Sequence, residues 1–276
     1  MDKISEDILV HKLTHSCATR RCIPCLHKIF PYGKSGLPSN QRPELCPRSK
    51  PSSSRLSSFL HQRFDQVLIL GDGDFSFSLS LARSVSEGAS AKKCLIFATS
   101  YESFDNIVKI YPDAEKNICF LRKLGAIVLH GVDATCLETH ADISILRNSF
   151  GAVFWNFPCV SMSDGADAQY AEVEENRNLL TKFFENVKDY LQPAAYNSMS
   201  EIAQYPGEVY ISHKTIPPFI WWGLTELAER SGLIHHTSLV FDKYLFPGYS
   251  NKKVCKNQSF PLHDARVRIY VLILAL

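Results

Sequence analysis

The sequence lacks any hydrophobic run long enough to cross a membrane. Its longest unbroken apolar stretch is Ile269 to Leu276, eight residues, whereas a transmembrane helix needs about 20. The N-terminal thirty residues carry Asp2, Glu6 and Asp7 and lack the continuous apolar stretch of a secretory signal. We therefore expect an intracellular protein without membrane association, in the nucleus, the nucleolus or the cytoplasm.

Cysteine occurs nine times, but without the spacing of a disulfide framework. After residue 90 most cysteines stand singly in apolar or helical segments, so we expect reduced thiols. These are Cys94, Cys119, Cys136 and Cys159. Near the N-terminus a C-x2-C pair followed by a histidine is a weak zinc candidate, because the usual second ligand pair is missing. That set is Cys17, Cys22, Cys25 and His27.

Basic charge is concentrated at the N-terminal end. Residues 1–64 hold 11 Lys and Arg against 4 Asp and Glu, and the rest holds 19 against 24. Tyr32 to Ser58 is rich in Pro, Ser and Gly and has no helical or strand period. We therefore predict a flexible basic leader and linker over residues 1–63, where attraction to nucleic acid would be strongest, and a folded domain over 64–276.

From Phe64 onward, short apolar runs alternate with helical patterns, which is typical of parallel strands covered on both faces. The sequence predicts an α/β fold with a mostly parallel seven-stranded sheet. The expected strands are Val67–Leu70, Leu95–Ser100, Ile127–His130, Ala152–Asn156, Val209–His213, His236–Tyr244 and Val267–Leu274, the last two antiparallel. The expected helices are Phe75–Val85, Tyr101–Leu124, Cys136–Arg147, Glu172–Leu191 and Trp222–Ser231.

A glycine turn follows the first predicted strand. Gly71, Asp72 and Gly73 lead directly into a helix, and glycines at such a turn let the backbone approach a ligand. Ser76 replaces the third glycine of the dinucleotide pattern. Asp72 and Asp74 would repel a pyrophosphate but suit a cationic sulfonium with its ammonium group. The turn therefore favours S-adenosylmethionine over NAD as cofactor, and a turn without any ligand is the simpler alternative.

Acidic residues follow the next two strands. Glu102 lies where Rossmann-type domains hold ribose hydroxyls, although it could equally be a first-turn residue stabilised by the helix dipole. Asp133 lies past the third strand, where an adenine amino group would be met, or serves as an N-cap.

The fourth and fifth strands deliver polar residues to the same edge. Asn156, Phe157 and Pro158 form a turn whose carbonyl groups point toward a substrate, because proline cannot continue the ladder. His213 is either a base or a satisfied core residue, and Lys214 follows it.

Taken together, these blocks resemble the Rossmann-like class I methyltransferase domain of the large-subunit rRNA (uridine-N3) methyltransferase family. The segments that carry the resemblance are LGDGDFSFSLSLA, ATSYES, YPDAEKNICFLRKLGAIVLHGVDAT, the NFP turn, GEVYISHKT, FPGYSNK and SFPL. The resemblance implies S-adenosylmethionine-dependent methylation of a uridine ring nitrogen in ribosomal RNA, and we expect a monomer.

Residue by residue, the resemblance assigns the cofactor loop, the adenosine side and the substrate side. The cofactor loop is Gly71, Asp72, Gly73, Asp74, Phe75 and Ser76, the adenosine side Glu102 and Asp133, and the substrate side Asn156, Phe157, Pro158, His213 and Lys214.

The chain departs from this family where the NFP turn is usually followed by histidine, since Cys159 and Val160 stand there instead. Pro193 and Pro206-Gly207 are also separated by an insertion that we expect to be a flexible surface segment. Two further hypotheses remain: a catalytically inactive Rossmann-fold module that acts in RNA binding or ribosome assembly, and, ranked below it, an NAD-type oxidoreductase.

Overall fold

Seven strands form one sheet in the computed structural model, which describes residues 64–86, 94–160, 171–196, 202–262 and 267–274. The strands are β1 (Gln66–Leu70), β2 (Leu95–Ser100), β3 (Ile127–His130), β4 (Ala152–Asn156), β7 (Glu208–Lys214), β8 (Leu233–Val240) and β9 (Val267–Leu274). Their order is β3-β2-β1-β4-β7-β9-β8. The basic leader and its zinc candidates lie outside the described residues.

The strands from β3 to β7 run parallel, and β9 is antiparallel to both β7 and β8. The predicted seven-stranded sheet and the antiparallel final pair are therefore confirmed. β8 occupies Leu233–Val240, so it starts three residues before the predicted strand His236–Tyr244 and ends four residues before it. Gly232, at φ 85°, ends the preceding helix in the left-handed region, so the strand starts directly after it.

The apolar character of the last strand follows from its position. β9 lies between β7 and β8, so both of its edges are paired, and the neighbouring Val271 and Leu272 enter the two apolar cores on opposite faces of the sheet. Val271, Leu272 and Ile273 are accordingly all buried.

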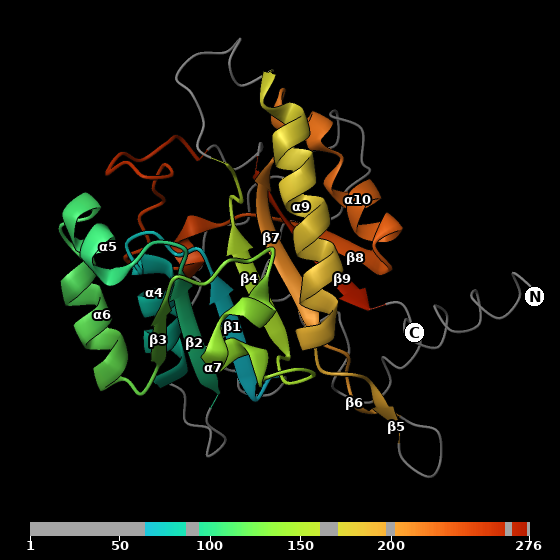
Figure 1. The fold of residues 1–276 in the computed structure, drawn as a ribbon, viewed down its shortest axis with the longest axis horizontal. Coiled ribbons are helices and arrows are strands. Elements are labelled where there is room, and N and C mark those ends of the chain that lie inside the picture. Colours follow the sequence, from blue (N-terminus) through green and yellow to red (C-terminus); the bar gives the residue numbers. More distant parts are fainter. Residues whose placement is uncertain (1–63, 87–93, 161–170, 197–201, 263–266, 275–276) are drawn as a thin grey trace, which may run out of the picture.

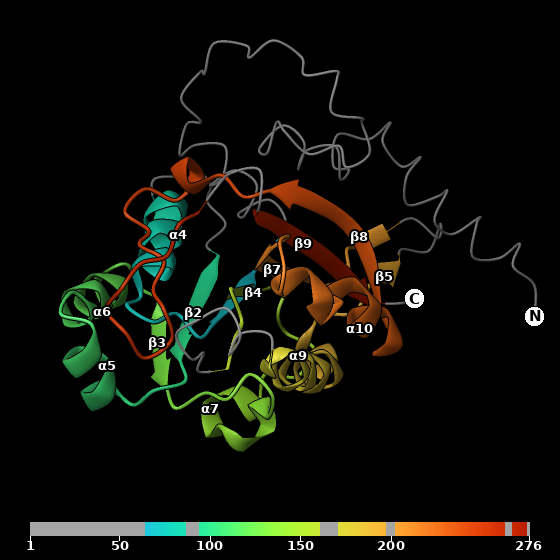
Figure 2. The ribbon, with the colours of Figure 1, turned by 90° about the horizontal axis from the view of Figure 1, so that it is seen from above.

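Helices cover both faces of the sheet (Figures 1 and 2). One apolar core joins α4 and α6 to one face, and a second joins α7, α9 and α10 to the other. The helices are α4 (Ser76–Ser86), α5 (Phe104–Ile110), α6 (Ala114–Lys123), α7 (Ala141–Ser144), α9 (Val173–Val187) and α10 (Leu224–Arg230). The short 3-10 turns are η2 (Leu137–Thr139), η3 (Lys188–Tyr190), η4 (Phe219–Trp222) and η5 (Lys243–Leu245).

Two predicted helices are wrong in length. The expected helix Tyr101–Leu124 is two helices, because Pro112 lacks an N–H and holds Tyr111 extended at φ −121°. The expected Cys136–Arg147 is only η2 and α7. The expected Trp222–Ser231 is present as α10, which begins only at Leu224, after the left-handed Gly223 at φ 63°.

The insertion after Pro193 contains a short hairpin. β5 (Ala195–Tyr196) pairs antiparallel with β6 (Ile202–Gln204). The pair extends from the lower part of the body in Figure 1, so the described part of this segment is a surface feature with local structure.

Within the described ranges no helix combines the length and apolar character needed to span a bilayer. The five described cysteines are all free thiols. They include the four that the sequence predicted to be reduced, together with Cys255.

We predict that the apolar face of α9 contributes strongly to stability. Phe184 is fully buried between the helix and the sheet, so Phe184→Ala should lower the free energy of unfolding by about 3–5 kcal/mol. Lys182→Ala, two residues earlier on the exposed face, should change it by less than about 0.5 kcal/mol. Urea unfolding measures both, and equal effects would contradict the packing described here.

Candidate active site

The turn between β1 and α4 presents two carboxylates to the start of the helix. Asp72 Oδ2 accepts hydrogen bonds from the N–H of Ser78 at 2.7 Å and from its hydroxyl at 2.6 Å. Asp74 Oδ1 accepts one from the N–H of Ser76 at 3.0 Å. The first N–H groups of a helix lack partners within it and attract anions. Here the chain's own carboxylates already occupy that position.

The backbone of this turn is tightly constrained. Gly71 and Phe75 are both left-handed, at φ 60° and 61°, and such a conformation costs a residue other than glycine about 1–3 kcal/mol. The fully buried ring of Phe75 fixes its position. A Cβ on Gly73 would lie 3.3 Å from the ring of Tyr111. The turn is therefore a narrow cradle, in which even a β-carbon at Gly73 would press against Tyr111.

The pKa of Asp72 is raised to about 7, mainly by burial and also by the nearby charge of Asp74, against the opposing effect of hydrogen bonds from Ser78. Asp72 is therefore partly protonated at neutral pH. Asp74 Oδ2 lies 3.7 Å from the ammonium of Lys252. Two adjoining buried carboxylates with one cation nearby make this a place that favours a positively charged ligand.

Glu102 lies just past β2, at the edge where the sequence predicted a ribose site. Its Oε2 accepts a hydrogen bond from Asn106 Nδ2 at 3.1 Å, and Cys255 Sγ donates to its Oε1 at 3.5 Å. Both contacts join exposed or half-buried groups, so polar ligand groups can compete for these oxygens.

Asp133, past β3, holds its own turn. Its Oδ1 accepts hydrogen bonds from the N–H of Thr135 at 2.8 Å and from its hydroxyl at 2.7 Å. This turn-capping contact involves only one of the two carboxylate oxygens.

His130, the last residue of β3, joins this region although the sequence analysis did not select it. Its Nδ1 lies 2.8 Å from the hydroxyl of Ser100, at the end of β2. The rings of Phe75 and Phe104 meet the imidazole edge-on at 5.5 and 5.6 Å. Its Nε2 is buried and has no hydrogen-bond partner among the described residues. Burial lowers the pKa of His130, which favours a neutral imidazole at this edge of the sheet.

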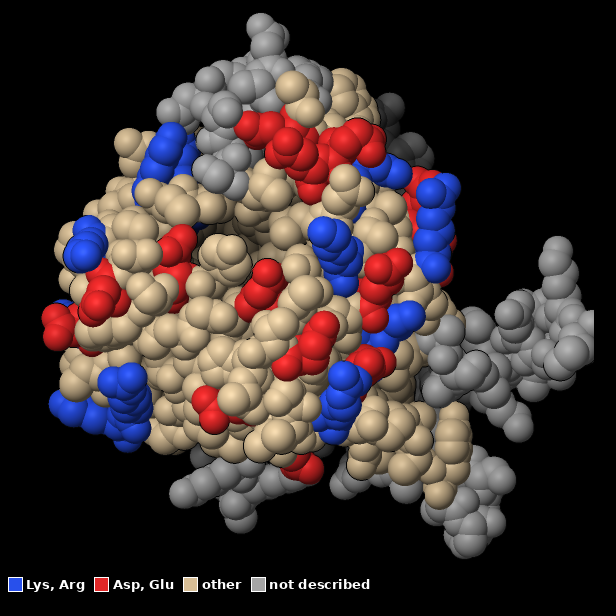
Figure 3. All heavy atoms as spheres, viewed as in Figure 1, with Lys and Arg blue, Asp and Glu red and all other residues tan. Residues whose placement is uncertain are grey.

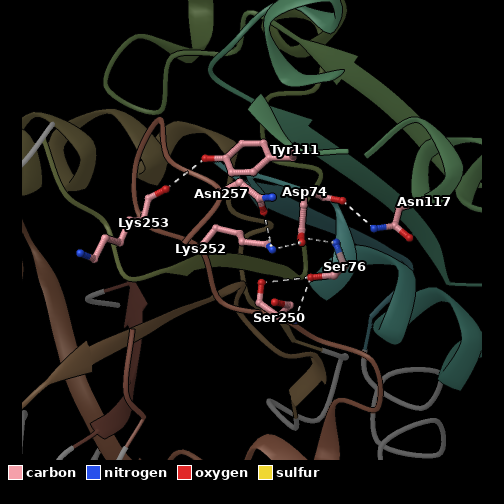
Figure 4. A network of polar contacts seen from close by, with 8 residues as sticks. All are labelled: Asp74, Ser76, Tyr111, Asn117, Ser250, Lys252, Lys253 and Asn257. Atoms are coloured by element: carbon pink, nitrogen blue, oxygen red, sulfur yellow. Dashed lines mark hydrogen bonds and ion pairs between the residues drawn. The ribbon is translucent and has the colours of Figure 1, made fainter. Parts of the chain in front are cut away.

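A C-terminal loop closes over the glycine turn (Figure 4). The hydroxyl of Ser76 accepts a hydrogen bond from the N–H of Ser250 at 3.0 Å and lies 3.4 Å from the carbonyl of Ser250, to which it can donate. The hydroxyl of Tyr111 donates to the carbonyl of Lys253 at 3.1 Å. These contacts join segments 142 and 174 residues apart in the sequence. Sequence reasoning assigned no role to Tyr111, Ser250 or Lys252, and the block FPGYSNK was the only signal that pointed to the loop.

The predicted substrate turn lies beside β7. The hydroxyl of Ser212 donates to Asn156 Oδ1 at 2.6 Å, and the N–H of Phe157 donates to the carbonyl of Ser212 at 2.8 Å. Phe157 is left-handed at φ 53°, which re-aims the chain before the buried Pro158. Strain of this kind at a strand end is characteristic of functional turns.

Lys214 lies on the same face of the sheet as Asn156. Its ammonium is 4.5 Å from the ring centroid of Phe219 and 4.6 Å from that of Phe260, and Phe260 also meets Phe157 edge-on at 5.0 Å. Burial lowers the pKa of Lys214. An aromatic-bound cation therefore lies against the substrate turn.

Cys159 follows that turn, at the position where the family resemblance led us to expect a histidine. Its thiol donates to the carbonyl of Val160 at 2.8 Å. Burial raises the pKa of Cys159 to about 12, despite the opposing effect of Lys214. The thiol keeps its proton at neutral pH and does not serve as a base.

His213 points away from this group. Neighbouring residues of a strand face opposite sides, so His213 packs with Trp222 at 4.9 Å between ring centroids, and its Nε2 lies 3.0 Å from the carbonyl of Phe219. Burial lowers the pKa of His213 to about 4. Of the two roles left open, its surroundings are those of a satisfied core histidine.

On the face shown in Figure 3 the surface is hollowed near its centre, over the region where Figure 1 draws the upper ends of β1 and β4. Mostly uncharged atoms line the hollow, and acidic side chains lie on either side of it. Basic and acidic side chains are interspersed over the rest of this face.

The strand order, the helices on both faces and the glycine turn at the first strand end define a Rossmann-like class I methyltransferase fold. The chain belongs more specifically to a family described as "rRNA (uridine-N3-)-methyltransferase BTM5-like", whose model matches residues 68–253.

Similar proteins include Heavy metal-associated isoprenylated plant protein 41 of Arabidopsis thaliana, 38% identical over 188 residues, which are 68% of this chain and 33% of that protein. The chain therefore spans about a third of this relative. The 25S rRNA (uridine(2634)-N(3))-methyltransferase of Saccharomyces cerevisiae is 24% identical, over 76% of this chain and 73% of that protein. The crystal structure of a 30S ribosomal A1408 methyltransferase from an uncultured bacterium is 14% identical at a TM-score of 0.43, covering 82% of this chain and 94% of that one.

We predict that Asp72 makes stability depend on pH. Its pKa is raised from 3.8 to about 7 by folding, so the native state binds the proton more tightly than the unfolded state. The resulting stabilisation, up to about 4 kcal/mol, is complete below pH 3.8 and is lost as the pH rises through about 7. Asp72→Asn should remove this slope in urea unfolding between about pH 4 and 8, whereas Asp113→Asn, at an exposed carboxyl, should keep it. An unchanged slope in Asp72→Asn would contradict the raised pKa.

Proposed function

We propose that this chain is an S-adenosylmethionine-dependent methyltransferase that acts on N3 of a uridine in ribosomal RNA. Membership of the family supports the reaction class. The observation that carries the proposal is the pair of carboxylates, Asp72 and Asp74, at the start of α4. In dinucleotide-binding folds the same helix position binds a pyrophosphate, which these carboxylates would repel.

The residues present fit S-adenosylmethionine. The bare backbone at Gly71 and Gly73 leaves a cradle that a side chain would fill. Asp74 would hold the ammonium of the ligand, and Glu102 the two ribose hydroxyls through its paired oxygens. Asp133 and the unpartnered Nε2 of His130 would meet the adenine edge. When bound, the cofactor supplies a methyl group on a positively charged sulfur.

The substrate turn would orient the uracil. The half-buried Asn156, held by Ser212, and the carbonyl of Phe157 would contact the base edge, and Pro158 keeps that carbonyl out of the sheet ladder. Orienting the nitrogen in line with the methyl group is itself a large contribution to rate.

Removal of the N3 proton would depend on a nearby positive charge that stabilises the uracil anion, more than on a side chain that accepts the proton. Cys159 holds its own proton, and His213 lies on the other face of the sheet. Deprotonation of uracil places negative charge on its carbonyl oxygens, and Lys214 offers a cation beside the turn. We infer that Lys214 stabilises this charge while the proton leaves to solvent.

The partner would be ribosomal RNA. The described domain presents mixed charges on the face of Figure 3, so the basic leader, with 11 Lys and Arg against 4 Asp and Glu in residues 1–64, would supply most of the salt-dependent affinity. A monomer acting in the nucleolus, nucleus or cytoplasm remains our prediction.

The cofactor proposal predicts a signal in calorimetry with S-adenosylhomocysteine and none with NAD. Gly73→Val should lower the affinity for S-adenosylhomocysteine at least about 100-fold, because a branched side chain would enter the cradle against Tyr111. Gly73→Ala should lower this affinity less. Thermal melts should show that both variants are folded. NAD binding without S-adenosylhomocysteine binding would make an oxidoreductase the better hypothesis.

The reaction proposal predicts 3-methyluridine in ribosomal RNA taken from cells that lack this protein and incubated with it and the methyl donor. Nucleoside mass spectrometry measures the product. Asn156→Ala should abolish it, and Lys214→Met should lower the rate by about 100-fold or more with unchanged cofactor affinity. RNA and cofactor binding without product, even in Cys159→His, would favour a module that only binds RNA.

A further inference from the structure

Lys252 is a largely buried cation in the wall of the proposed cofactor site. Its side chain is 16% exposed, and its ammonium lies 3.7 Å from Asp74 Oδ2. Among the described residues it makes one hydrogen bond, to Asn257 Oδ1 at 2.8 Å. The ammonium thus lies beside a buried carboxylate of the glycine turn, so its charge bears directly on which ligand groups this wall can bind.

The surrounding loop holds Lys252 in place (Figure 4). The residues on either side are fixed to the glycine turn and to α5's C-terminal end, through the Ser250–Ser76 pair and the Lys253 carbonyl on Tyr111. The backbone carbonyl of Asp74 is held separately by Asn117 Nδ2 at 2.8 Å. Both charged groups therefore have positions set by other contacts, independent of their attraction to each other.

The separation of the two charges is the informative feature. A directly hydrogen-bonded ion pair has an N–O distance of about 2.7–2.9 Å, whereas these atoms stand 3.7 Å apart. Asp74 uses Oδ1 for the N–H of Ser76, and Oδ2 faces the ammonium. The result is a negative and a positive group side by side, each with bonding capacity left for a third partner.

An amino-acid head group carries the complementary pair, an ammonium and a carboxylate on one carbon. We propose that Asp74 and Lys252 together recognise this head group on the methyl donor, with the ligand ammonium on Asp74 and the ligand carboxylate on Lys252. This inference rests on the proposed function and adds Lys252 as a specificity-determining residue. It requires that the site distinguish S-adenosylmethionine from a sulfonium nucleoside that lacks the carboxylate.

The test compares S-adenosylmethionine with its decarboxylated form, which keeps the sulfonium and the ammonium and loses only the carboxylate. Calorimetry on the full chain should give a preference for S-adenosylmethionine of about 10- to 100-fold. Lys252→Met should reduce that preference to about twofold or less, and Lys252→Arg should retain most of it, because a guanidinium also binds carboxylates. Lys243→Met, which removes an exposed cation from η5, is the matched control and should keep the wild-type preference.

The ratio of the two affinities distinguishes a role of Lys252 in recognition from a displacement of the loop by the substitution. A displaced loop would lower the affinity for both ligands alike and leave the ratio unchanged. An unchanged ratio in Lys252→Met, or tighter S-adenosylmethionine binding in that variant, overturns the inference and makes Lys252 only a counter-ion of Asp74. A wild-type chain that binds neither ligand would instead refute the proposed cofactor, and the inference with it.

Discussion

Two carboxylates buried at the start of α4 set the conditions for the rest of the site. Each takes N–H donors from the first turn of the helix, which stabilises negative charge there. The remaining repulsion is relieved in two ways: Asp72 keeps a proton up to about pH 7, and Lys252 brings a positive charge from a distant loop. The turn thus carries net negative charge that a positive group stabilises. A cationic ligand could bind there without displacing the hydrogen bonds between the carboxylates and the helix.

The sheet was predictable because its strands are short apolar runs that must be buried. The continuous apolar run of β9 follows the same rule, because Val271 and Leu272 point into the two cores on opposite faces of the sheet. Helix lengths were not predictable from apolar periodicity alone, because single residues end helices. Pro112 interrupts one long periodic segment, and the left-handed Gly223 delays the start of α10 until Leu224. In both cases the proline or glycine itself is a local sequence signal that outweighs the helical period of the apolar residues.

The site was predictable only where it follows strand ends. Asn156 and the two aspartates were found because parallel strands finish at one edge. The alternation of β7 already separates His213 from Ser212 and Lys214, so its position on the opposite face was available from the sequence. Lys252 was not, since its contact with the glycine turn depends on a chain reversal through β8 and a loop 174 residues from Ser76.

The residues that the proposed function requires lie on one face of the sheet, and His213 lies on the other. Asn156 and Lys214 lie on the face covered by α4, together with the glycine turn, while His213 packs on the other face against Trp222. A neutral, buried histidine there stiffens the strand that carries its two neighbours, but it cannot exchange a proton with a substrate across the sheet. In the proposed reaction N3 of uracil would therefore lose its proton to water. The enzyme would contribute by lowering the free energy of the resulting uracil anion. Lys214, held on two aromatic rings, is suited to that role. Partial burial strengthens the electrostatic interaction of its ammonium with a nearby anion. Among the described residues no carboxylate forms an ion pair with it.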